Sequence, residues 1–327
     1  MPRISVPIRA ATRLAVALVV LATTAHAQDS RDTAFDLTRL NVSSRSAALA
    51  GAASALPGDD PAALYANPAL LTPEAERHLS LGYLNHLDGM SAGFATYAHN
   101  VGGASRLAVG VRYLSYGEFD RAADDGTTDG TFAASEAAVT LGYSRDINSR
   151  LRVGASAHGL FESVDDASGS ALVADVGAAY QIPSQQLTLT ASVHGIGAVT
   201  SSLGADDARL PVDLRVGVAK KLRYLPLTFS VTGYELQRYD NAEGGNALDE
   251  ALRHVVAGGE LQLGKALALR VGYDPGRAED LRTGGRLDLA GMNVGFGIDT
   301  KRVAVDYARV GWGEFGGLHQ FGVRIGM

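Results

Sequence analysis

The sequence contains no cysteine, only 10 prolines and a single tryptophan among its 327 residues. The absence of cysteine excludes a disulfide framework, a thiolate zinc site and a cysteine nucleophile. Basic residues do not outnumber acidic ones, and the formal net charge of −6 argues against a nucleic-acid-binding protein, which would carry a basic surplus. Proline is too scarce for a disordered Gly/Pro-rich tract, although glycine, at 39 residues, is more frequent than in an average protein.

Beyond its N-terminus the sequence also lacks any apolar run long enough for a membrane-spanning helix, which needs about 20 residues. The N-terminus has three arginines, then the apolar stretch 14–22, then an Ala-His-Ala motif at 25–27. A basic start, a short apolar segment and an A-x-A motif predict a cleavable signal peptide at residues 1–27, and they argue against a retained membrane anchor. The mature protein is therefore expected to be exported.

The body of the sequence alternates between apolar and polar residues. In the segment 211–222, for example, Leu214 and Val216 alternate with Asp213 and Arg215. Such a period of two is typical of strands with one apolar and one polar face, and most segments have the roughly 10 residues that a tilted strand needs to cross a bilayer. A change of phase at Gly233 predicts a bulge. About fourteen segments are expected to be strands: 78–85, 91–100, 105–116, 131–145, 150–162, 170–182, 186–196, 211–222, 226–238, 252–263, 266–274, 288–299, 301–311 and 317–327.

The links between these segments alternate between short and long. Most of the intervening links are long and polar, and we expect loops at 117–130, 162–169, 197–210, 237–251 and 275–287. Short turns at one end and long loops at the other are typical of outer-membrane barrels. An even number of strands also returns the C-terminus to the side where the barrel begins. The sequence therefore predicts an all-β protein, an antiparallel transmembrane β-barrel of about 14 strands over residues 78–327, located in the outer membrane and surrounded by its lipid and lipopolysaccharide.

A soluble β-sandwich or a propeller is the alternative. A sandwich also alternates, but its strands are shorter, and no 40–50-residue repeat suggests a propeller. Charges on the polar face would be costly in a sandwich core and are tolerated in a wet lumen. The charged residues on that face are Arg112, Arg152, Asp175, Asp213, Arg215, Arg270, Asp306 and Arg324.

Residues 28–77 do not alternate. They hold a run of small residues at 46–56, an acidic turn before Pro61, and Asn67 directly before a proline, which favours a turn. A compact segment of small residues ahead of the first strand can fold back into the barrel as a plug, and small residues on the inner wall would leave room for it. The alternative is a periplasmic cap without a role in function.

Three motifs in this segment, at 45–52, 59–61 and 67–71, resemble the N-terminal pattern of the PorV/PorQ group, which are FadL-like outer-membrane barrels of the type IX secretion system. Further pieces are similar to the PorQ branch, at 113–119, 210–211, 221–227, 258–260 and 269–273. The plug-motif residues that carry the resemblance are Arg45, Gly51, Asp59, Asp60, Pro61, Asn67 and Pro68.

The resemblance implies a fourteen-stranded barrel with an N-terminal plug that takes part in secretion or surface attachment of proteins, alongside PorZ-, PorU- and PorV-like partners. The alternative function is that of the FadL relatives, the transport of hydrophobic small molecules. A general porin is less expected, because a plug obstructs the lumen.

No catalytic constellation is visible. The sequence lacks G-x-S-x-G, a P-loop and H-E-x-x-H, and its eight histidines are scattered singly, as expected of lumen or loop residues rather than metal ligands. We therefore expect a non-enzymatic protein without a cofactor or metal.

Overall fold

The computed structural model describes residues 34–85, 89–122, 127–203, 209–238, 247–283, 289–300 and 302–327. The expected signal peptide, 1–27, and the start of the segment 28–77 lie outside these ranges. The described chain forms a closed barrel of fourteen antiparallel strands, preceded by a series of short helices.

Each strand pairs with its neighbours in the sequence, and β1 closes the ring against β14 over eight residue pairs, from His78 with Gly326 to Asn85 with His319. Closure leaves no free sheet edge, which is a requirement for a sheet that crosses a bilayer. The strands are β1 (His78–Asn85), β2 (Ser91–Gly102), β3 (Ser105–Ala122), β4 (Thr128–Asp146), β5 (Leu151–Val164), β6 (Ala167–Ile182), β7 (Leu187–Ser201), β8 (Asp213–Lys221), β9 (Leu227–Gly233), β10 (Val255–Leu263), β11 (Leu267–Tyr273), β12 (Met292–Asp299), β13 (Val303–Gly311) and β14 (Gly317–Gly326). The predicted fold class and the number of strands are confirmed.

The two faces of the wall differ as the alternation predicts. In β4, Val139 and Leu141 are more than half exposed on the outer face, whereas Thr140 between them is buried. Exposed apolar side chains of this kind occur on nearly every strand, and together they form the surface that a lipid bilayer would cover. The inner face carries the polar and charged residues, so the interior of the barrel is the place to look for a site.

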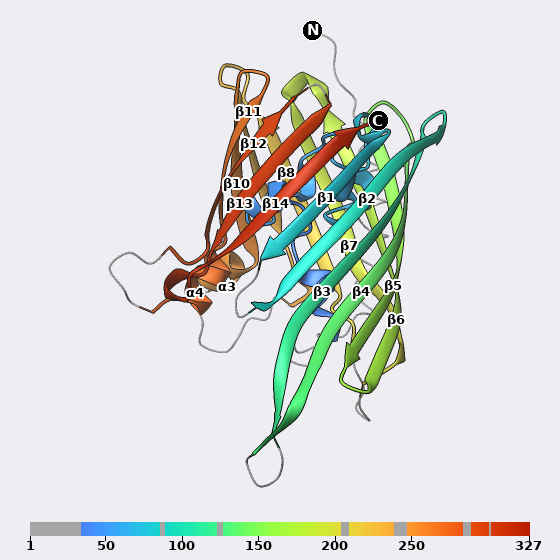
Figure 1. The fold of residues 1–327 in the computed structure, drawn as a ribbon. Coiled ribbons are helices and arrows are strands. Elements are labelled where there is room, and N and C mark those ends of the chain that lie inside the picture. Colours follow the sequence, from blue (N-terminus) through green and yellow to red (C-terminus); the bar gives the residue numbers. More distant parts are fainter. Residues whose placement is uncertain are drawn as a thin grey trace.

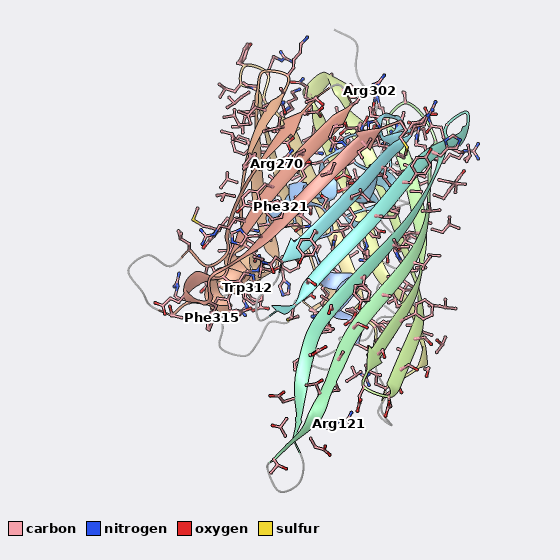
Figure 2. All side chains as sticks on the ribbon, in the orientation of Figure 1. Arg121, Arg270, Arg302, Trp312, Phe315 and Phe321 are labelled. Atoms are coloured by element: carbon pink, nitrogen blue, oxygen red, sulfur yellow. The ribbon has the colours of Figure 1, made fainter. Side chains whose placement is uncertain are left out.

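The wall is uneven in height. Strands β3 to β7 have 14–19 residues each, whereas β8 to β14 have only 7–10. The hairpin of β3 and β4 projects beyond the other strands, and the short strands carry α3 (Ala247–Arg253) and α4 (Pro275–Asp280) at the same end (Figure 1). Arg121 lies near the tip of that hairpin, while Arg302 lies at the opposite end, beside the C-terminus (Figure 2).

Three loop predictions need correction. Strand β3 runs to residue 122 and β4 begins at 128, so most of the expected loop 117–130 is paired sheet. Strands β5 and β6 meet in a turn with Val164 paired to Ala167, which removes the expected long loop 162–169, and β7 continues into the expected loop 197–210. Most of these residues are polar or small, so the alternation of apolar and polar residues fades there although the hydrogen-bonded ladder continues.

The bulge predicted at Gly233 is also absent: β9 ends at that residue. Glu235 follows with a φ of 49°, and a short helical turn, η9 (Leu236–Arg238), takes the chain away from the sheet. The spacing of the apolar residues Tyr234 and Leu236 matched the alternation of a strand, which is why the sequence predicted that the strand continues. The expected loops 237–251 and 275–287 are partly helical, since they contain α3 and α4.

Residues 34–77 lie inside the barrel as short helical turns (Figure 1). We call this segment the plug. Its elements are η2 (Asp36–Arg39), α2 (Ser44–Ala48), η3 (Ala52–Ala55), η4 (Pro61–Tyr65), η5 (Pro68–Leu70) and η6 (Pro73–Ala75). Helix α2 contacts β11 to β14, η3 contacts β7 to β10, and η5 contacts β4 to β6, so the plug touches the wall around most of its circumference. In the part of the chain described, no helix has both the length and the apolar character needed to cross a membrane.

Candidate functional site

The plug sits against glycines of the inner wall. A Cβ added to Gly154 would lie 2.4 Å from the backbone of Pro68, and one added to Gly272 would lie 2.3 Å from the backbone of Leu49. Neither backbone can yield as a flexible side chain would, so any other residue at these positions would push the plug off the wall. Other wall glycines in close approach to the plug are Gly110, Gly142, Gly177, Gly217, Gly258 and Gly295. The high glycine content therefore has a structural cause.

Four of the predicted plug-motif residues form two copies of one helix start. Asp60 accepts a hydrogen bond of 2.9 Å from the amide of Ala62, and Asn67 accepts one of 2.9 Å from the amide of Ala69. Pro61 and Pro68 follow as the first helical residues. Proline has no N–H, and this costs nothing at that position because the first amide of a helix has no hydrogen-bond partner within the helix. These four residues therefore shape the plug. Gly51, with a φ of 87°, lies between α2 and η3, where the left-handed backbone suits glycine.

Arg45 joins the plug to the wall. Its Nε and Nη2 atoms each donate a hydrogen bond of 2.8 Å to the two carboxylate oxygens of Glu260 in β10. Burial opposes the charge of Arg45, but Glu260 outweighs that effect and raises the pKa of the guanidinium above its usual range. A bidentate arginine–carboxylate ion pair is among the stronger polar interactions in proteins.

The Arg45–Glu260 pair belongs to a larger network on the wall. Arg270 contacts Glu260 at 2.8 Å and Asp306 at 2.5 Å, and Arg324 reaches Asp306 at 3.8 Å. Arg324 also reaches Asp59 of the plug at 3.3 Å. Of the charged residues predicted to face the lumen, Arg270, Asp306 and Arg324 thus belong to one network with Glu260. The network holds two of the predicted plug-motif residues, Arg45 through Glu260 and Asp59 through Arg324.

The start of the plug occupies an apolar chamber. Phe35 and Leu37, each 2% exposed, pack into a cluster of wall residues. The amide of Leu37 donates to Glu136 Oε2 at 2.9 Å, and Arg112 donates to the carbonyl of Leu37 at 3.3 Å. The chamber is formed by Leu114, Ala138, Leu160, Ala171, Val173 and Leu210. Sequence reasoning missed it because these residues are scattered over five parts of the chain.

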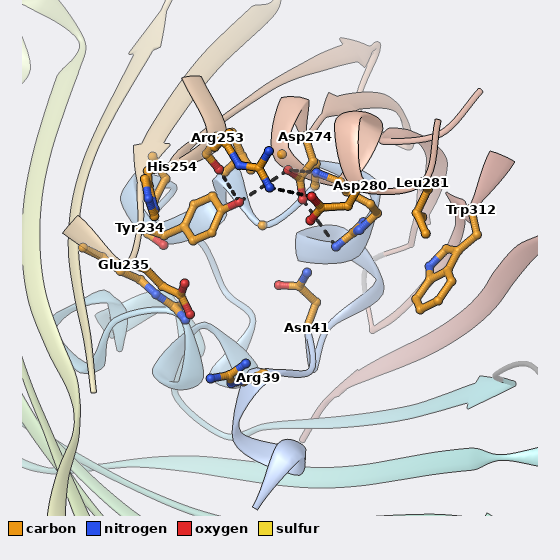
Figure 3. Close-up of a pocket in the computed structure, with 18 residues that line it drawn as sticks. Arg39, Asn41, Tyr234, Glu235, Arg253, His254, Asp274, Asp280, Leu281 and Trp312 are labelled. Atoms are coloured by element: carbon orange, nitrogen blue, oxygen red, sulfur yellow. Dashed lines mark hydrogen bonds and ion pairs between the residues drawn. The ribbon is translucent and has the colours of Figure 1, made fainter. Parts of the chain in front are cut away.

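A polar cavity of about 500 Å³ lies between the plug and the end of the barrel that carries α3 and α4 (Figure 3). Tyr234 donates a hydrogen bond of 2.8 Å to the carbonyl of Arg253, whose guanidinium contacts Asp280 at 2.5 Å. Burial, assisted by the neighbouring carboxylates of Asp274 and Glu235, raises the pKa of Tyr234. The cavity is lined by Arg39, Asn41, Ala50, Gly51, Ser54, Arg215, Thr232, Tyr234, Glu235, Arg253, His254, Val256, Asp274, Gly276, Arg277, Asp280, Leu281 and Trp312.

Two histidines expected to be isolated meet at one carboxylate. His158 Nε2 and His194 Nδ1 each lie 3.0 Å from Asp175 Oδ2. Ser192 lies 2.9 Å from His194 Nε2, which gives the Ser–His–Asp connectivity of a hydrolytic triad. Ser192 is only 1% exposed, however, so its hydroxyl has no access to a substrate. The contacts account for a buried polar cluster and supply no accessible nucleophile. No group of three or more potential metal ligands occurs within the described ranges.

No family model and no curated protein matches this sequence. Solved structures do. The Pseudomonas putida toluene transporter TodX matches with a TM-score of 0.56 and 14% identity, over 86% of this chain and 95% of TodX. The monoaromatic hydrocarbon channel CymD matches with a TM-score of 0.53 and 12% identity, over 89% of this chain and 97% of CymD. At these identities the likeness is one of fold. The chain is therefore similar to FadL-type outer-membrane barrels.

Proposed function

We propose that this protein is an outer-membrane transporter through which small hydrophobic molecules pass, with the plug controlling passage. The shared fold with a toluene transporter and a hydrocarbon channel supports the proposal. The observation that carries it is the apolar chamber, which is the part of the lumen suited to a hydrophobic ligand and is filled by Phe35 and Leu37 of the plug itself.

Phe35 has the features expected of a displaceable occupant. Its φ of 65° lies in the left-handed region, which costs a bulky residue about 1–3 kcal/mol. A hydrophobic ligand that takes the place of the Phe35 ring would release that strain and would keep the chamber walls covered. The start of the plug is held by backbone hydrogen bonds, such as those of Ala34 with Arg209 and of Leu37 with Glu136, and among the described residues it makes no ion pair like that of Arg45 with Glu260. The first residues of the plug can therefore leave while the rest stays fixed.

The experiment is uptake of labelled long-chain fatty acid and of labelled toluene by intact cells of the native host, with the gene deleted and then restored. Deletion is expected to lower uptake, and the Phe35→Ala variant is expected to raise it several-fold over the restored wild type. Phe321→Ala is the matched control, because Phe321 is half exposed on the outer face. Unchanged uptake of both compounds on deletion would exclude the transporter function.

A second function, a PorQ-like component of type IX secretion, is favoured by one observation. The predicted plug-motif residues Arg45 and Asp59 are tied into the wall network, which suits a rigid barrel that anchors surface partners such as PorZ-, PorU- and PorV-like proteins. The test is a comparison of surface and supernatant proteomes of the deletion strain and its parent. Loss of proteins with C-terminal sorting domains from the surface would support this function, and an unchanged surface proteome would exclude it.

A further inference from the structure

The turn between β8 and β9 holds two apolar side chains away from the rest of the protein. Tyr224 is 91% exposed, more than any other large apolar or aromatic side chain in the described part of the chain, and Leu225 beside it is 57% exposed. The turn is tied to the neighbouring strand, because the amide of Gln262 in β10 donates a hydrogen bond of 2.8 Å to the carbonyl of Pro226. An exposed tyrosine and leucine on a fixed turn suit a membrane interface, where tyrosine is enriched.

Four cations surround these two side chains in the sequence and in the fold. Lys220, Lys221 and Arg223 precede Tyr224 directly, and all three are exposed. Lys265 is exposed in the adjoining turn, between β10 and β11. The ion pairs of the described residues include none of these four cations.

Carboxylates of the neighbouring strands are engaged on the lumen side. Glu260 of β10 binds Arg45 at 2.8 Å, and Asp299, at the end of β12, binds Arg324 at 3.2 Å. The other described carboxylate side chains at this end of the barrel lie before β1 and between β4 and β5: Glu74, Glu76 and Asp146. The positive charge of the β8–β9 turn is therefore left for a partner outside the barrel.

The turn is continuous with the outer face of the wall. Lys220 lies on the same face of β8 as Val216 and Val218, because alternate residues of a strand point to the same side, and Val216 is half exposed. Across the sheet Lys220 pairs with Phe229 of β9, which is also half exposed. The cations thus stand where the apolar outer face ends, at the end of the barrel that carries Arg302 (Figure 2). In a bilayer this is the level of the lipid headgroups, which long basic side chains reach readily.

We propose that the β8–β9 turn binds the headgroup of an anionic phospholipid. The phosphate lies among Lys221, Arg223 and Lys265, while Tyr224 and Leu225 insert between the headgroup and the acyl chains. A water-soluble anion would use the cations and leave Tyr224 and Leu225 uncovered. A phospholipid without net charge would leave the positive charge of the turn uncompensated. The site lies on the outer surface and does not depend on what passes through the lumen.

The test is native mass spectrometry of the full protein in a neutral detergent. The protein is titrated with phosphatidylglycerol, with phosphatidylcholine of the same acyl chains, and with glycerol 3-phosphate. Each lysine or arginine near an anionic membrane surface strengthens binding by about fivefold, so two such cations make a difference of about 25-fold. We therefore expect phosphatidylglycerol to bind saturably and at least about 25-fold more tightly than phosphatidylcholine. Glycerol 3-phosphate, which has no acyl chains, should bind far more weakly than phosphatidylglycerol.

Three variants separate the charged part of the site from the apolar part. Arg223→Gln and Lys221→Gln should each weaken the binding of phosphatidylglycerol by about fivefold and leave that of phosphatidylcholine unchanged. Tyr224→Ala should weaken the binding of both lipids alike, because it removes the contact with the part of the molecule that they share. All three side chains are exposed, so the barrel is expected to fold in every variant.

Arg150→Gln is the matched control. Arg150 is exposed in the turn between β4 and β5, at the same end of the barrel but with β6 and β7 between that turn and β8. The proposal is overturned if the two lipids bind equally well, if glycerol 3-phosphate binds as tightly as phosphatidylglycerol, if Arg150→Gln weakens binding as much as Arg223→Gln, or if all three turn variants bind as the wild type does. None of these outcomes bears on hydrocarbon uptake, so the two proposals succeed or fail separately.

Discussion

Arg45 and Glu260 are 215 positions apart in the sequence and are joined by two hydrogen bonds of 2.8 Å. The pair connects the plug to β10, and through Arg270 of β11 and Asp306 of β13 it connects the plug to two further strands. A segment of short helical turns has little stability of its own, so these contacts fix its position. Changes at this pair should therefore affect the plug before they affect the barrel.

Replacement of Arg45 by methionine should loosen the plug. The side chains of Arg45 and Glu260 are 17% and 13% exposed. The loss of stabilising free energy is therefore expected to be about 1–2 kcal/mol, less than for a fully buried ion pair. The measurement is limited proteolysis of the refolded protein, in which cleavage within residues 34–77 should become faster. Arg302→Gln should leave cleavage unchanged. Equal protease resistance of wild type and Arg45→Met would contradict the proposed anchoring role.

Gly154→Ala should displace the plug from β5. The added methyl group would lie 2.4 Å from the carbonyl carbon of Pro68, and that contact is with backbone. Gly159→Ala is a control on the same strand, because its Cβ would meet only the Phe161 ring at an ordinary 3.7 Å. We expect a lower thermal unfolding midpoint for the first variant alone. Equal midpoints would show that the plug is not seated as described.

Val139→Arg should destabilise the barrel in a bilayer by about 2–4 kcal/mol, if its position is near the middle of the membrane. Val139 is 58% exposed on the outer face of β4. Thr131→Arg is the control, since Thr131 stands in the same strand opposite Asp120, where water is expected on both faces. Reversible urea unfolding in lipid vesicles measures both. A smaller destabilisation by Val139→Arg than by Thr131→Arg would show that Val139 does not lie near the middle of the membrane.

Tyr234 should remain protonated at a pH at which an exposed tyrosine has ionised, because burial and then Asp274 and Glu235 raise the pKa above its ordinary value of about 10. Its contribution to stability is complete below about pH 10 and is lost as the pH rises through the higher folded-state pKa. The alkaline absorbance titration of wild type minus Tyr234→Phe should show this late ionisation. The control, Tyr224→Phe, removes a tyrosine that is 91% exposed and should leave the late ionisation of Tyr234 in place.

Sequence reasoning located the strands because their alternation is imposed by lipid on one side and the lumen on the other. Around Gly117 and Asp165 most residues are polar or small and the alternation fades, so these paired residues were expected to be loops. After Gly233 the apolar residues Tyr234 and Leu236 keep the spacing of a strand, but β9 ends at Gly233, so the predicted bulge is absent. The candidate site was harder to predict. Arg112 was expected to face the lumen, but nothing in the sequence indicates that it lies over the Tyr65 ring and donates to the carbonyl of Leu37, because that depends on which distant residues the closed barrel brings near.

The same limit applies to His158, Asp175 and His194, which stand on β5, β6 and β7 and meet only through strand register. The plug-motif residues were predicted as a set, and the structure divides them. Asp60, Pro61, Asn67 and Pro68 shape the plug's turns, whereas Arg45 and Asp59 hold it in place. Residues of one motif can therefore have two physical roles.

The closure of β1 against β14 has a consequence for the order of assembly. The plug precedes β1 directly in the chain, and β1 finds its last partner only when β14, the final strand, is complete. Contacts between such distant segments carry the largest loop-closure cost, so the seam is expected to form late in folding. Once the ring is closed, the wall is continuous, and a plug that is still outside has only the two ends of the barrel as a way in. A plug that enters before the seam forms has the gap between β1 and β14 as well, so the time at which the seam closes decides which routes the plug can take.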